Sequence, residues 1–168
     1  MKATYKWLKE LCPTLGSAEE AARLLEGVGL EVASIVSIGG GDAVIDLEVP
    51  SNRSDLLGVI GIAREIAAAK GQPLVLPPTA SLTPVTVLPS LTVRLEEPTG
   101  CPRYTALEAT IATDARTPDW MKQRLEALGM RTIHPMVDLT NYVMLECGQP
   151  MHAFDGAALK ERTIVIRR

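Results

Sequence analysis

The stretch LEVASIVSIGGGDAVIDLEV, residues 30–49, decides the architecture of the first part of this chain. Its first half, residues 30–38, is rich in β-branched side chains, which are enriched in strands. Three glycines follow and provide a turn. In residues 44–49, apolar side chains alternate with the carboxylates Asp46 and Glu48, which is the period of a half-buried strand. Two strands joined by a glycine-rich turn predict an antiparallel hairpin.

Helix and strand signals surround this hairpin. Ser17 and Glu20 form a capping-box pattern at the start of one helix, and glycines close several others. The helices are expected at residues 4–11, 17–28, 55–70, 117–128 and 135–148. Further strands are expected at residues 91–96, 103–112 and 163–168. Helices and strands that do not alternate regularly predict an α+β fold.

Two glycines, Gly58 and Gly61, fall inside the expected helix 55–70. Each costs a helix interior roughly 1 kcal/mol relative to alanine. Close packing of this helix on the sheet is the simplest explanation for both.

Six prolines between Gln72 and Pro98 indicate a linker with at most one short strand. We therefore expect an α+β domain at residues 1–78, a linker with a first strand at 79–100, and a second domain at 101–168. A strand at the very end of so short a second domain suggests that this domain continues in a longer protein.

Composition limits the function classes. The net charge is −3 and no basic stripe is present, which disfavours a dedicated nucleic-acid-binding surface. Three cysteines without a Cys-x-x-Cys pair disfavour a disulfide frame. No apolar run reaches the length of a membrane span. We expect a cytoplasmic protein without membrane contact.

Residues 138–155, DLTNYVMLECGQPMHAFD, carry the most specific polar pattern. A Gly-Gln-Pro breaker places Asn141 in a helix and His152 in the loop that follows. Asn is a poor residue in a helix interior unless its amide is used, and a loop imidazole is accessible for proton transfer. Both can equally be structural or merely exposed, and Asp138 can serve only as a favourable charge near a helix N-terminus.

Metal and phosphate sites are not expected. The two histidines, His134 and His152, lack a metal-ligand spacing. The alternation of the strand explains Asp46 and Glu48 without a magnesium ion. No Lys-Ser/Thr follows the glycines at 39–41, so a phosphate-binding loop is not supported.

Eight segments match one known family: residues 5–8, 29–32, 46–55, 61–66, 101–104, 120–125, 128–131 and 138–155. Together they resemble the β subunits of bacterial phenylalanyl-tRNA synthetases. The resemblance covers nearly the whole chain apart from the linker, and it is most specific at 138–155. Two differences stand out: only Gly39–Gly41 occupies the place where most members insert a tRNA-binding domain, and the family's subunit is several times longer.

The resemblance implies that the second domain is the N-terminal part of a mixed α/β editing domain. This domain hydrolyses tyrosine wrongly esterified to tRNA(Phe), and its site is lined by an Asn and a His that fall on Asn141 and His152. We expect His152 to position water or act as general acid or base, and Asn141 to hydrogen-bond the substrate or the water. The acidic residue that reads the tyrosyl hydroxyl would lie beyond Arg168, so this chain alone would lack full editing activity.

The resemblance also implies partners. These are the synthetase α subunit, which holds the aminoacylation site, and tRNA(Phe), within a heterotetramer. ATP and Mg²⁺ belong to the whole synthetase, and no cofactor is expected in this chain. Two alternatives stay open: a non-catalytic assembly module and a free-standing trans-editing hydrolase.

Overall fold

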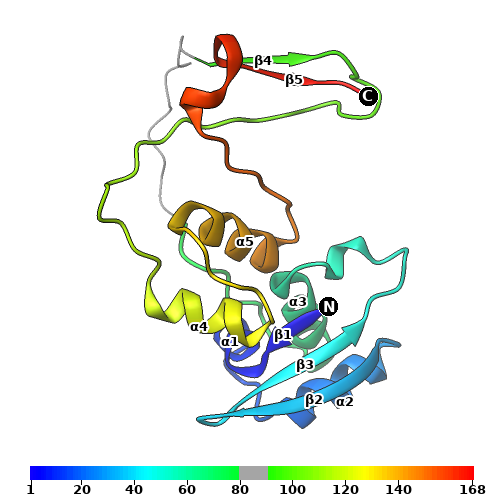
Figure 1. Cartoon of the computed structure of the whole chain (residues 1–168). Coiled ribbons are helices and arrows are strands. Elements are labelled where there is room, and N and C mark those ends of the chain that lie inside the picture. Colours follow the sequence, from blue (N-terminus) through cyan, green and yellow to red (C-terminus); the bar gives the residue numbers. More distant parts are fainter. Residues whose placement is uncertain (80–90) are drawn as a thin grey trace. The chain divides into compact units, whose positions relative to one another are not determined.

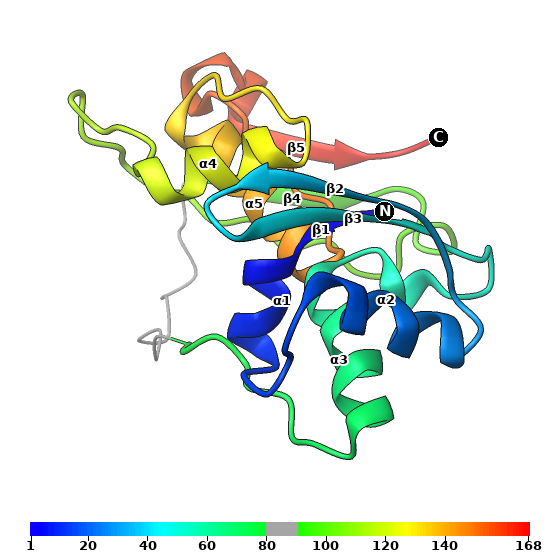
Figure 2. The same ribbon diagram turned by 90° about the horizontal axis from the view of Figure 1, so that it is seen from below.

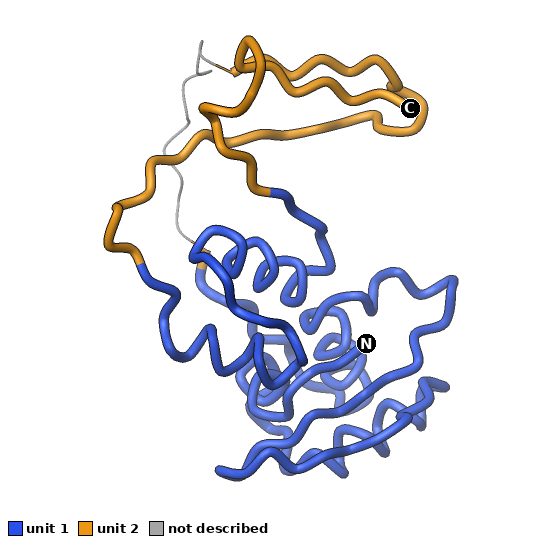
Figure 3. The backbone as a smooth tube through the Cα atoms, viewed as in Figure 1, with its two compact units in different colours: residues 1–78, 116–152 blue, residues 79–115, 153–168 orange. Residues whose placement is uncertain are grey.

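The computed structural model describes residues 1–79 and 91–168. These residues form two compact units, coloured separately in Figure 3. The first unit comprises residues 1–78 and 116–152, and the second comprises 79–115 and 153–168. The expected linker falls partly on residues 80–90, which lie outside the described part of the chain.

A three-stranded antiparallel sheet organises the first unit (Figure 1). Its strands are β1 (Lys2–Thr4), β2 (Glu31–Gly39) and β3 (Asp42–Glu48), in the order β1-β3-β2. Ile45 in the central strand lies opposite Ala3 on one side and Ile35 on the other. The predicted hairpin is therefore confirmed. All three turn glycines, 39–41, have positive φ angles, which other residues rarely adopt.

Two helices begin at residues that cap them, and of these caps the one at Ser17 was predicted. Helix α1 spans Tyr5–Leu11, and Thr4 caps it by accepting a hydrogen bond from the Trp7 amide. Helix α2 spans Ala18–Gly27, and the Ser17 hydroxyl accepts from the Glu20 amide at 3.1 Å. Figure 2 shows α1, α2 and α3 (Val59–Lys70) together on one side of the sheet.

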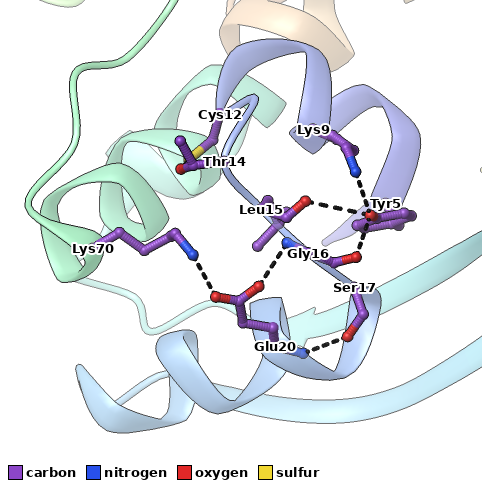
Figure 4. Close-up of polar contacts among 9 residues, drawn as sticks. All are labelled: Tyr5, Lys9, Cys12, Thr14, Leu15, Gly16, Ser17, Glu20 and Lys70. Carbon is purple, nitrogen blue, oxygen red and sulfur yellow. Dashed lines mark hydrogen bonds and ion pairs between the residues drawn. The ribbon is translucent and has the colours of Figure 1, made fainter.

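The carboxylate of Glu20 does not complete the expected capping box. It accepts from the Gly16 amide at 2.6 Å rather than from Ser17, and it also pairs with Lys70 (Figure 4). The Tyr5 hydroxyl donates to the Gly16 carbonyl at 2.8 Å. The connection between α1 and α2 is thus held by α3 as well, since Lys70 is its last residue.

The expected helix 55–70 divides into two parts. A 3₁₀ turn covers Ser54–Leu56, and helix α3 covers Val59–Lys70, ending at Gly71 with φ 62°. Gly58 is the N-cap and not an interior residue. The expectation that Gly58 and Gly61 pack on the sheet is wrong: the nearest neighbours of Gly58 are backbone atoms of residues 146–148, and those of Gly61 belong to Asp55 and Leu56.

Two further helices complete the first unit. Helix α4 spans Asp119–Ala127, and helix α5 spans Pro135–Cys147. Helix α4 begins two residues after the start of the expected range 117–128, because Pro118 is its N-cap and the Thr117 hydroxyl donates a hydrogen bond to Asp138. Both helices join the core of residues 1–78 through the buried side chains of Met121, Leu125, Leu128 and Tyr142.

The second unit contains a pair of parallel strands. Strand β4 (Thr92–Leu95) pairs with β5 (Thr163–Ile166), so that Val93 lies opposite Ile164. Two 3₁₀ turns, Gly156–Ala158 and Lys160–Arg162, precede β5. The expected strand at 103–112 is wrong, since this segment is irregular and largely exposed. Its residues are suited to a strand, but no strand of the described residues pairs with them.

The α+β class is confirmed by this combination of helices with small sheets. Residues 116–152 belong to the same compact unit as residues 1–78, and the domain boundaries at 78 and 101 stay a prediction.

Candidate functional site

Helix α5 carries Asn141 and is defined at both ends by local chemistry. At its start, His134 is the N-cap and its Nδ1 accepts a hydrogen bond from the Met136 amide at 3.3 Å. Pro135 occupies the first helical turn, where a missing N–H costs nothing. At its end, Gly148 has φ 76° and donates to the Met144 carbonyl at 2.8 Å. A left-handed glycine of this kind is a common helix terminator.

Asp138, in the first turn of α5, has a structural environment. Its side chain is buried, with 1% exposure. One carboxylate oxygen accepts from the Thr117 hydroxyl at 2.5 Å, and the other accepts from the Ile133 amide at 2.9 Å. Asp138 therefore ties the start of α4 and the connection before α5 to the first turn of α5. Sequence patterns alone do not predict Thr117 as its partner, because Thr117 precedes α4 and lies 21 positions before Asp138 in the chain.

Asn141 lies one turn further along α5 and is partly exposed. Its side-chain amide makes no hydrogen bond to any residue of the described segments, His152 included. An amide in this state can donate to and accept from a bound molecule without breaking an internal bond.

The next residue, Tyr142, is the buried anchor of the helix. Its hydroxyl accepts from Arg124 Nη1 at 2.9 Å and donates to Glu146 Oε1 at 3.1 Å. Its ring stacks on Trp7, with centroids 4.8 Å apart, and meets Trp120 edge-on. Burial raises the pKa of Tyr142 to about 12, although the Arg124 cation opposes this shift. This anchor fixes the orientation of the helix that presents Asn141.

His152 lies in the irregular segment after Gly148, and its side chain is exposed. Gly148 ends α5, and Gln149, Pro150 and Met151 lead to His152 without regular secondary structure. Asn141 and His152 both belong to the first unit, and their assignment as a site stays a prediction.

Three features limit the chemistry. Within residues 1–79 and 91–168, no group of three or more His, Cys, Asp or Glu side chains could hold a metal ion. Cys12, Cys101 and Cys147 are free thiols. None of the helices in the described segments is long and apolar enough to cross a membrane.

Part of the chain matches a known domain family. Residues 100–168 match the B3/4 domain. Over almost its whole length, the chain is also homologous to part of the β subunit of phenylalanine–tRNA ligases, which confirms the resemblance found in the sequence.

The individual relatives match this chain to a similar degree. The β subunit of Rhodopirellula baltica is 45% identical over 170 residues, which cover 99% of this chain and 24% of that protein. The subunit of Thermotoga maritima is 41% identical over 157 residues, covering 91% and 20% respectively. That of Legionella pneumophila is 38% identical over 151 residues, covering 86% and 19%. The chain thus spans about a quarter or less of these relatives.

Proposed function

We propose that this chain forms part of a phenylalanine–tRNA ligase β subunit and supplies two residues of a site that hydrolyses Tyr-tRNA(Phe). The observation that carries the proposal is Asn141, whose amide makes no hydrogen bond to a described residue and lies on a helix anchored by its neighbour Tyr142. The homology to these β subunits supports the substrate class.

The need for such a site is physical. A pocket that accepts phenylalanine discriminates only about 10²-fold against an isostere that merely adds a hydroxyl. Tyrosine is such an isostere. A second site that removes tyrosine from tRNA(Phe) corrects the error.

In this mechanism, a water molecule attacks the carbonyl carbon of the aminoacyl ester. His152 orients the water and takes its proton, then returns a proton to the departing ribose oxygen as the ester C–O bond breaks. Asn141 hydrogen-bonds the ester or the water and holds it in line. The products are tyrosine and tRNA(Phe). Positioned proton transfer of this kind contributes about 10²–10⁴-fold to a rate.

The proposed setting is the cytoplasm, in a heterotetramer with the α subunit and with tRNA(Phe) as the shared substrate. The aminoacylation reaction, with its ATP and Mg²⁺, belongs to the whole complex. An acidic residue that recognises the tyrosyl hydroxyl is supplied by another part of the β subunit.

The test is the rate of Tyr-tRNA(Phe) hydrolysis by the synthetase complex that contains this chain. The variants His152→Ala and Asn141→Ala should each lower this rate by about 10²-fold or more, while aminoacylation with phenylalanine is retained. His134→Asn is the matched control, because it removes the other imidazole and keeps an N-cap residue on α5.

Full hydrolysis by both alanine variants would contradict the proposal. If those variants also still bound the α subunit, a non-catalytic assembly function would be favoured instead. Hydrolysis by the isolated chain at the rate of the complex would favour a free-standing trans-editing hydrolase.

A further inference from the structure

Gly58 and Gly148 mark a point where two backbone segments pass in direct contact. A Cβ atom added to Gly58 would lie 2.4 Å from the Gly148 nitrogen and 2.6 Å from the Cys147 carbonyl carbon. It would also lie 2.9 Å from the Glu146 oxygen. All three are backbone atoms, which cannot rotate away as a flexible side chain can. The last turn of α5 would have to shift to accommodate any side chain at position 58.

The contact is reciprocal. A Cβ atom added to Gly148 would lie 3.2 Å from the Leu57 carbonyl carbon and 3.3 Å from the Gly58 nitrogen. Gly148 is also constrained by its φ of 76°. Gly58 differs, because its φ of −145° is extended backbone that any residue adopts. Position 58 therefore requires glycine for space alone.

This constraint differs from that at Gly61. A Cβ atom there would lie 1.8 Å from the Asp55 oxygen, so Gly61 serves the turn that leads into its own helix. The constraint at Gly58 connects the start of α3 with the end of α5, two elements distant in the sequence.

We infer that Gly58 is a positioning residue for His152. Close approach at Gly58 sets where α5 ends, and residues 149–151 lead from that point directly to the imidazole. The catalytic part of the inference rests on the proposed function, in which His152 handles the proton. A displacement of about 1 Å of a reacting group can lower a rate by about 10²-fold.

The experiment uses the two histidines of the chain, whose imidazole resonances can be followed separately by NMR. Gly58→Ala should shift the resonance of His152 and leave that of His134, at the opposite end of α5, nearly unchanged. Gly27→Ala is the matched control, because nothing lies within 4 Å of a Cβ atom at this helical position. It should move neither resonance.

Gly148→Ala is the second variant and decides the matter if Gly58→Ala does not fold. It should shift the His152 resonance selectively, because its Cβ atom presses on the same crossing. An unchanged His152 resonance in the folded variants would overturn the inference. Equal shifts of both histidines would also overturn it, since they indicate general loosening.

A second readout separates this inference from the proposed function. In the synthetase complex, Gly58→Ala should lower kcat for Tyr-tRNA(Phe) hydrolysis by about 10²-fold, and Gly27→Ala should not. If the wild type does not hydrolyse this substrate while His152 shifts selectively, the proposed function fails and the positioning role stands. If the wild type is active and Gly58→Ala keeps full activity with an unshifted His152, only the positioning role fails.

Discussion

Trp7 in α1 and Tyr142 in α5 stack face to face, with ring centroids 4.8 Å apart and planes inclined by 17°. The Arg124 guanidinium of α4 lies 4.9 Å from the centre of the Trp7 ring and 5.4 Å from that of Trp120. Arg124 also pairs with Glu10 of α1. This cluster therefore attaches both helices of segment 116–152 to the first helix of the chain.

Replacing Trp7 tests how much this attachment contributes to the stability of the fold. Trp7 is only 1% exposed, so Trp7→Ala should lower the free energy of unfolding by about 3–5 kcal/mol, the usual cost of truncating a buried tryptophan. Trp120 is 50% exposed, and Trp120→Ala should cost about 1 kcal/mol. Denaturant unfolding of both variants measures the difference. Equal losses of unfolding free energy would contradict the larger contribution expected of Trp7.

The bond between Thr117 and Asp138 gives a second prediction. Thr117→Val keeps the shape of the side chain but removes a hydrogen bond to a buried carboxylate. We expect a loss of about 1.5–3 kcal/mol in the free energy of unfolding. Thr117→Ser is the control, because it retains the hydroxyl and loses one methyl, worth about 0.8 kcal/mol. A Thr117→Val variant as stable as the wild type would show that the hydroxyl contributes nothing.

The elements that the sequence predicts well are those whose signals are local. Ser17 caps α2 through its own helix, and Gly148 ends α5 because only a left-handed residue fits there. The hairpin β2–β3 follows from alternation and a glycine turn. Each of these features depends on neighbours within a few residues, so the local sequence is sufficient to predict it.

The errors concern partners distant in the sequence. Residues 103–112 have strand-forming composition, but a strand also needs a neighbour to pair with. Gly58 was expected to face the sheet, and it meets the end of α5 instead. Glu20 was expected to bond Ser17, and it bonds Gly16 and Lys70. The candidate site shows the same difficulty with distant partners. Residue type indicated Asn141 and His152, but it did not indicate that Tyr142 anchors the helix of Asn141 to the core.

The Glu20 carboxylate predicts a stability change at acidic pH. Hydrogen bonds from Lys70 and from the Gly16 amide hold the pKa of Glu20 below its ordinary value (Figure 4). The folded state therefore prefers the ionised form. This contribution is fully present above the unfolded pKa, about 4.3, and is lost as the pH falls through the lower pKa of the folded state.

Thermal unfolding of Glu20→Gln checks this prediction. The variant should melt below the wild type at neutral pH, and the gap should narrow as the pH is lowered through this range. Glu26→Gln is the charge-matched control on the same helix, since Glu26 is exposed and forms no ion pair with another described residue. A gap that persists at the lowest pH would assign the effect to packing rather than to ionisation.

Tyr142 predicts the opposite dependence at alkaline pH. Burial raises its pKa to about 12, compared with about 10 in an unfolded chain. The folded state prefers the neutral phenol, so this contribution is present below about pH 10 and is lost as the pH rises towards 12. Tyr142→Phe keeps the stack on Trp7 but cannot ionise. It should cost about 1 kcal/mol at neutral pH, through the lost hydrogen bonds, and this difference should diminish or reverse in alkali.

Tyrosinate absorbance measures the ionisation of Tyr142 directly. The wild type has three tyrosines, and the substitution should remove the last of their ionisation steps. Removal of an early step instead would show that the Tyr142 phenol is accessible to solvent.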